Sequence, residues 1–248
     1  MVAIVTGATA GFGLEITRQF VAQGKKVIAI GRRAERLHAL AAELGPAVHP
    51  LALDLRDTDA IAALPDSLPE EFSKITILVN NAGLALGLEK AQDAHWNDWK
   101  TMIDTNITAL VAITRAFLPG MIDRQVGHIV NIGSVAGTYP YAGGNVYGAT
   151  KAFVKQFSLN LRADVFGTPL RVTNIEPGLV GGTEFSQVRF HGDEKLAASR
   201  YEGVTALDAK DVAEAVSWVV NLPAHVNINR LELMPVAQSF SALSIDKK

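Results

Sequence analysis

Tyr147 and Lys151 lie four residues apart in segment 146–166, whose apolar spacing predicts a helix. Positions i and i+4 share one helix face, so the phenol and the ammonium are expected to converge on one point. A free tyrosine, with a pKa of about 10, is a poor acid or base at neutral pH, but a nearby positive charge lowers that pKa. Such a tyrosine can give a proton to a carbonyl oxygen while a hydride reaches the carbonyl carbon. Because this spacing also arises by chance on helix surfaces, the interpretation depends on the surrounding residues.

Two polar residues are candidates to assist this pair. Ser134 follows the predicted strand 128–132, at the carboxyl edge where the sites of α/β proteins lie, and its hydroxyl can bind the same substrate oxygen. It can equally be a loop residue or a helix cap. Asn106 falls inside the predicted helix 96–118, an unfavourable place for asparagine. Asn106 bends the helix, or it is a buried amide whose hydrogen bonds are satisfied within the protein, or it acts catalytically through a water link from its backbone to Lys151.

A glycine-rich turn, residues 6–13, joins the first predicted strand to the first predicted helix. Gly7 permits a tight turn, Gly11 lets backbone approach a pyrophosphate, and Gly13 lets the helix pack closely on the strand. The helix N-terminus then offers free N–H groups and a favourable dipole to an anion. The alternative is a glycine-rich turn without a ligand, but the order of strand, glycines and helix favours a nucleotide site.

Arg32 and Arg33 follow the second predicted strand, where nucleotide-binding folds face the adenosine ribose. An acidic residue there would repel a 2′-phosphate, whereas a guanidinium binds one through paired hydrogen bonds. The pair therefore favours NADP(H) over NAD(H), the alternative being two solvated arginines at the start of a helix, where cations are mildly unfavourable. Asp54 follows the third strand and is expected to touch the adenine, to cap a helix over residues 56–64, or both.

Short apolar runs alternate with helical segments along the whole chain, which predicts a single α/β domain, 1–248, with a doubly wound parallel sheet. Segment 178–203 is Gly-rich, then polar and irregular, as expected of a lid or binding loop, and residues 241–248 resemble a tail. The predicted strands are 2–5, 26–30, 48–53, 75–79, 128–132, 171–175 and 229–234, and the predicted helices are 12–23, 33–44, 96–118, 146–166 and 208–220.

Composition restricts the classes of partner. The net charge of −2 provides no field to attract nucleic acid or an anionic membrane surface. The absence of cysteine excludes disulfides and thiolate catalysis, and the six histidines show no metal-ligand spacing, so no metal is expected. No apolar run reaches the length of a membrane helix, and the first residues lack the features of a signal peptide. The sequence therefore predicts a soluble, cytoplasmic protein.

These motifs occur in the order and spacing of the short-chain dehydrogenase/reductase family, which the chain resembles over essentially its whole length. The resemblance rests on 6–13, 80–83, Asn106, Ser134, Tyr147 with Lys151, and 177–178. It implies a seven-stranded Rossmann sheet, hydride transfer with a nicotinamide, a tetrad of Asn106, Ser134, Tyr147 and Lys151, and a homotetramer built through two long helices. The expected cofactor-binding residues are Gly7, Thr9, Ala10, Gly11, Phe12, Gly13, Arg32, Arg33, Asp54, Leu55, Asn81, Ala82, Gly83, Tyr147, Lys151, Pro177, Gly178, Val180, Thr183 and Phe185.

Segments 83–87, 141–151, 176–185 and 222–229 resemble the NADP-dependent 3-hydroxy acid dehydrogenases more closely. This implies exchange of hydride with the 3-hydroxy or 3-oxo group of short acids: malonic semialdehyde and 3-hydroxypropionate, L-allo-threonine, serine and 3-hydroxyisobutyrate. Ser134 and Tyr147 would hold the reacting oxygen, and Arg189 or backbone near Gly182 the carboxylate, although a solvated arginine is an equal alternative. The rival functions are reduction of another carbonyl, such as a sugar, acyl-thioester or bulky ketone, and a non-catalytic NADPH-binding sensor.

Overall fold

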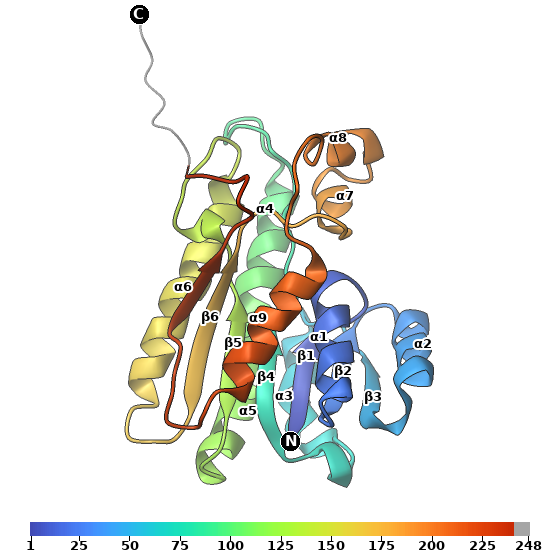
Figure 1. Cartoon of the computed structure of the whole chain (residues 1–248), viewed down its shortest axis with the longest axis vertical. Coiled ribbons are helices and arrows are strands. Elements are labelled where there is room, and N and C mark those ends of the chain that lie inside the picture. The colour runs from blue at the N-terminus through green and yellow to red at the C-terminus, as the bar shows by residue number, and fades with distance from the viewer. Residues whose placement is uncertain (241–248) are drawn as a thin grey trace, which may run out of the picture.

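Seven short apolar runs form one parallel sheet in the computed structural model, which describes residues 1–240 (Figure 1). The strand order is β3-β2-β1-β4-β5-β6-β7, so the chain reverses its direction of winding between β3 and β4. The central strands are buried on both faces, which explains their uninterrupted apolar sequences. The strands are β1 (Val2–Thr6), β2 (Lys26–Gly31), β3 (Val48–Ala52), β4 (Ile75–Asn80), β5 (His128–Ile132), β6 (Arg171–Pro177) and β7 (Arg230–Leu233).

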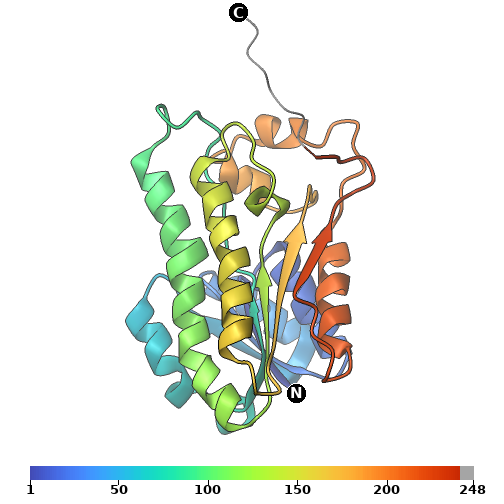
Figure 2. The same cartoon turned by 90° about the vertical axis from the view of Figure 1, so that its left-hand side faces the viewer.

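Helices cover both faces of this sheet and confirm the predicted doubly wound α/β fold. On one face lie α1 (Gly11–Ala22), α2 (Ala34–Leu44) and α9 (Ala209–Asn221), which enclose a core with Phe20 at its centre. On the other lie α3 (Thr58–Ser67), α5 (Ala109–Asp123) and α6 (Asn145–Asp164), whose core includes Phe117. Figure 2 shows α5 in green and α6 in yellow in front of the sheet.

The longest helix runs from residue 96 to residue 123 and combines α4 (Trp96–Ile103), a π-helical turn η3 (Asp104–Thr108) and α5. Within residues 1–240 it is the one helix long and apolar enough to cross a membrane. Ile113, Phe117 and Met121 pack into the core on one face of the sheet, whereas Trp96 and Ile103 are exposed. The π-helical turn contains Asn106 and is the local irregularity expected of an asparagine within a helix.

The segment predicted to be irregular, 178–203, contains two short helices, α7 (Phe185–Arg189) and α8 (Glu194–Ser199). Each has six residues or fewer, too short to show a helical period in the sequence. The Asp193 carboxylate accepts a hydrogen bond from the Leu196 N–H and so caps α8. Both helices stand over the carboxyl ends of the strands (Figure 1), where a lid is expected. The predicted tail, 241–248, lies outside the described residues.

Candidate active site

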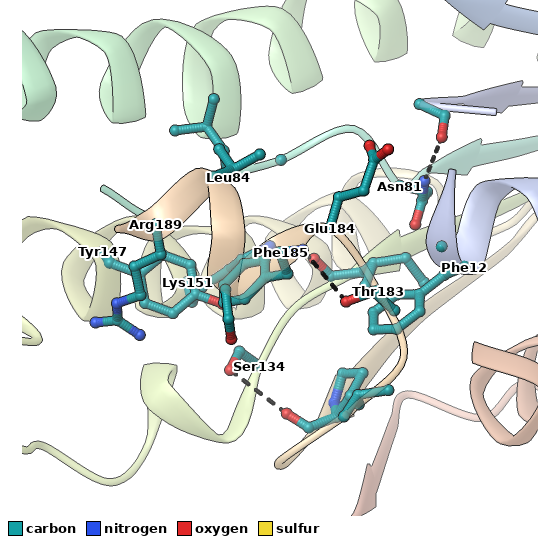
Figure 3. A pocket seen from close by; sticks show the side chains of 18 of the residues that line it. Phe12, Asn81, Leu84, Ser134, Tyr147, Lys151, Thr183, Glu184, Phe185 and Arg189 are labelled. Carbon is teal, nitrogen blue, oxygen red and sulfur yellow. Dashed lines mark hydrogen bonds between the residues drawn. The ribbon is translucent and has the colours of Figure 1, made fainter. Parts of the chain in front are cut away.

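A cavity of about 570 Å³ opens at the carboxyl ends of the strands, where β1 and β4 lie side by side. Its walls come from the β1–α1 turn, the ends of β2, β4, β5 and β6, the start of α6 and the segment around α7 (Figure 3). This is the edge at which ligands bind to doubly wound sheets, because the chain reverses direction there and leaves a crevice.

The glycine turn after β1 has the geometry of a close backbone contact. Gly7 has φ +68°, and a Cβ on it would lie 2.9 Å from the Asn81 Nδ2. A Cβ on Gly13 would lie 2.3 Å from the Gly7 carbonyl oxygen, so Gly13 packs α1 against the turn and does not line the cavity. No side chain caps the N-terminus of α1, which leaves its first N–H groups for an anion.

Asn81 joins this turn to the end of β4. Its Nδ2 donates to the Thr6 carbonyl at 2.8 Å, and the Thr6 Oγ1 accepts the N–H groups of Asn81 and Ala82, both at 2.9 Å. The neighbouring Gly83 leaves little room, because a Cβ there would lie 3.3 Å from the Asn106 Oδ1 and 3.4 Å from the Lys151 Nζ. The backbone that follows β4 therefore lies closely packed between the glycine turn and the buried Lys151.

Arg32 and Arg33 lie at one end of the cavity, together with Asp54 and Leu55. Arg33 donates to the Thr9 Oγ1 at 2.9 Å and to the Glu184 carboxylate at 2.7 Å. Asp54 pairs with Arg56, whose hydrogen bond lowers the pKa of Asp54 to about 2. A cap by Asp54 on the following helix is a wrong prediction, since α3 begins at Thr58 and its cap is Asp57.

Asn106 is 1% exposed and lies behind the wall of the cavity rather than in it. Its Oδ1 accepts the Leu84 N–H at 2.9 Å, while its Nδ2 donates to the Leu84 carbonyl and to the Thr150 Oγ1. The side chain is therefore the satisfied buried amide that was one reading of the sequence. It holds the segment after β4 against α6, beside Lys151, and the water link to Lys151 stays a prediction.

Ser134, Tyr147 and Lys151 meet at the floor of the cavity (Figure 3). Ser134 follows β5, caps the short helix η4 (Val135–Gly137) by accepting the Ala136 N–H, and donates to the Pro177 carbonyl at 3.4 Å. Tyr147 is in the first turn of α6 and Lys151 one turn later. The Lys151 Nζ donates to the Ile132 carbonyl at 2.7 Å and lies 5.9 Å from the centroid of the Tyr147 ring.

Burial changes the acidity of both groups. Burial raises the pKa of Tyr147 to about 12, although the Ser134 hydroxyl and the Arg189 guanidinium act to lower it. Burial also lowers the pKa of Lys151 to about 8. The expected lowering of the tyrosine pKa is therefore wrong for the protein alone, because loss of water around the phenolate outweighs the nearby positive charge.

The segment around α7 rests directly on Tyr147. The Phe185 ring packs edge-on against the Tyr147 ring with centroids 5.8 Å apart, and the Arg189 guanidinium lies 5.5 Å from the same ring centroid. Arg189 also donates to the Tyr141 hydroxyl at 2.8 Å and to the Gly87 carbonyl at 3.1 Å. A positive charge thus lies close to the Tyr147 ring, in the cavity that Ser134 also lines.

Most of the residues singled out in the sequence line this one cavity, whereas Gly13, Asn106 and Gly182 do not. Gly182 has φ +66° and belongs to the turn before α7, so it is better explained by backbone conformation than by substrate contact. Further lining residues had no distinct signal in the sequence, because they meet through contacts distant along the chain. Among them are Leu84, Thr105, Tyr139, Tyr141, Glu184, Arg200, Tyr201, Met234, Gln238 and Phe240.

Comparison with known proteins agrees with this geometry. Residues 1–194 match the family described as short chain dehydrogenase. The NADP-dependent 3-hydroxy acid dehydrogenase YdfG of Escherichia coli is 62% identical over 100% of both chains, and the serine 3-dehydrogenase of Agrobacterium fabrum is 53% identical over 98% of this chain and 96% of its own. A solved structure described as the closed form of serine dehydrogenase complexed with NADP⁺ is 62% identical, covers 100% of both chains and superposes with a TM-score of 0.99. The chain belongs to the short-chain dehydrogenase family.

Proposed function

We propose that this protein is an NADP-dependent dehydrogenase that oxidises the 3-hydroxyl of short 3-hydroxy acids and reduces the matching 3-oxo acids. The observation that carries the proposal is the Arg189 guanidinium, which lies over the Tyr147 ring in the same cavity as the glycine turn. A carboxylate-binding cation so close to the acid–base group suits a substrate whose hydroxyl and carboxylate are separated by two carbons. Serine, L-allo-threonine, 3-hydroxypropionate (the partner of malonic semialdehyde) and 3-hydroxyisobutyrate all have this arrangement.

The cofactor NADP lies across the carboxyl ends of the strands in this proposal. The turn from Thr9 to Phe12, which lines the cavity, would hold the pyrophosphate through its N–H groups, and Arg32 and Arg33 would hold the 2′-phosphate. Asp54 and Leu55 line the cavity beside these arginines and suit the adenine. The names of the two relatives in E. coli and A. fabrum and the NADP⁺ bound in the solved structure support this choice of cofactor and substrate class.

Bound NADP⁺ would supply the acceptor for the hydride that leaves C3 of the hydroxy acid. Tyr147 takes the hydroxyl proton and Ser134 fixes the substrate oxygen by a hydrogen bond. The buried ammonium of Lys151 lies beside the phenol of Tyr147. Asn106 holds the segment after β4 in place next to Lys151. Because burial raises the pKa of Tyr147 to about 12, the positive charge of the oxidised nicotinamide is needed to make the phenolate accessible.

Exposed apolar side chains support the further proposal of a homotetramer. Trp96 and Ile103 on the long helix and Phe153 on α6 are each at least 38% exposed, on the two helices that the family resemblance assigns to subunit contacts. Large exposed side chains of this kind are typical of surfaces that bury themselves against another subunit. A cytoplasmic location remains a prediction from the sequence.

A matched pair of substrates tests the carboxylate site. Wild-type enzyme should prefer 3-hydroxypropionate to the uncharged propane-1,3-diol in kcat/KM, and Arg189→Met should reduce this preference about ten- to hundredfold, mainly through KM, since a charge-assisted hydrogen bond is lost. Arg200→Met is the control, because Arg200 is the other arginine of segment 178–203 that lines the cavity. A preference that survives Arg189→Met but collapses in Arg200→Met would move the carboxylate to Arg200.

A further inference from the structure

Glu184, which Figure 3 shows between Thr183 and Phe185, immediately precedes α7 and pairs with two arginines at the start of α2. Its carboxylate binds two arginines at once, with one oxygen 2.7 Å from the Arg33 Nη1 and the other 2.6 Å from the Arg36 Nη1. Arg33 precedes the first residue of α2 and Arg36 lies in its first turn. Two cations at the positive end of a helix are unfavourable without a compensating charge, and Glu184 provides that charge.

Because Glu184 directly precedes α7, its ion pairs also hold one end of that helix. Phe185, the next residue, packs on Tyr147, and Arg189, at the other end of α7, binds Tyr141 and Gly87. The Gly87 N–H also donates to the Arg189 carbonyl at 2.8 Å. The helix α7 is therefore fastened at both ends, at Glu184 to the cofactor side of the cavity and at Arg189 to the segment after β4.

We propose that Glu184 is a positioning residue, whose bridge to Arg33 and Arg36 fastens α7 over the cavity and so sets the affinity for substrate without touching it. Arg33 lies at the cofactor end of the cavity, while Phe185 and Arg189 lie at the substrate end, so the bridge couples the two ends. This inference goes beyond the proposed function. It rests on the proposed function only for the choice of assay substrate.

The first test compares Glu184→Gln with Glu43→Gln. Both changes remove one charge at constant shape, and Glu43 forms a similar two-pronged, partly exposed pair with Arg18, remote from the cavity. Hydrogen exchange reports on α7 directly, because the N–H groups of Val188, Phe190 and Gly192 donate within this segment. In Glu184→Gln these amides should exchange about three- to tenfold faster. Each of the two exposed ion pairs favours the fastened segment over the open one by a factor of up to about five.

The same two variants are then compared in turnover, and a further pair of variants reverses the charges of the bridge. The KM for 3-hydroxy acid should rise about three- to tenfold in Glu184→Gln, with kcat within about twofold, whereas Glu43→Gln should match wild type. Glu184→Arg should exchange faster still, and adding Arg36→Glu should restore part of the protection. If Glu184→Gln exchanges at the wild-type rate and only binds NADPH more tightly, the bridge is not a fastening and the inference fails. Faster exchange with no turnover of any 3-hydroxy acid would uphold the inference and reject the proposed substrate.

Discussion

Lys151 places a buried positive charge in the site, and burying that charge lowers the stability of the folded protein. It is 6% exposed, donates to the Ile132 carbonyl, and has a pKa lowered to about 8 by burial. The unfolded chain binds more protons than the folded chain between that pKa and the ordinary lysine value near 10.4. The folded protein therefore gains stability as pH rises through this interval. A buried ammonium that costs stability but lies beside Tyr147 is consistent with selection for function.

The pH dependence of unfolding tests this assignment. Between pH 7 and pH 9.5 the free energy of unfolding of wild type should rise by about 1–2 kcal/mol relative to Lys151→Met, because only wild type releases this proton on folding. The interval ends below pH 10, where Tyr147, with its pKa raised to about 12, begins to act in the opposite direction. Urea unfolding of both proteins across this interval gives the difference. Parallel curves would show that the Lys151 pKa is not lowered.

At the scale of elements, the turn between β1 and α1 determines whether a nucleotide can approach. Gly13→Ala would put a methyl group 2.3 Å from the Gly7 carbonyl, so α1 must shift away from the sheet. We expect a loss of about 1–3 kcal/mol in stability and weaker NADPH binding. Gly120→Ala is the control, since the atoms nearest its Cβ belong to the Arg124 guanidinium and not to backbone, and alanine favours the interior of α5. Thermal unfolding and NADPH titration of both variants check this, and equal behaviour would contradict the packing role.

How far the sequence predicts each element depends on the range of the contacts that define it. The strands and the glycine turn follow from local patterns, and all seven strands were predicted within two residues. The helices α7 and α8 are too short for such a pattern. The contacts of Arg189 with Tyr141 and of Glu184 with Arg33 join residues far apart in sequence and leave no local signal. The raised pKa of Tyr147 was missed for a related reason, because burial is a property of the folded chain.

Over the whole protein, the sheet with its helices supports the catalytic side chains, while the segment around α7 packs over them. The sheet and its two helical layers bring Ser134, Tyr147 and Lys151 together from β5 and α6. The segment around α7 covers them and is anchored by contacts at its two ends. A segment that covers a site in this way excludes water and strengthens polar contacts in the cavity.

The most direct test of the account measures initial rates of nicotinamide reduction by purified protein with serine, L-allo-threonine and 3-hydroxypropionate. We predict turnover with NADP⁺, much less with NAD⁺, and a fall of about 10²- to 10⁴-fold in kcat for Tyr147→Phe with NADPH binding retained. Absence of turnover with all three acids despite tight NADPH binding would contradict the substrate class. Turnover that survives Tyr147→Phe would contradict the assignment of Tyr147 as the acid–base group.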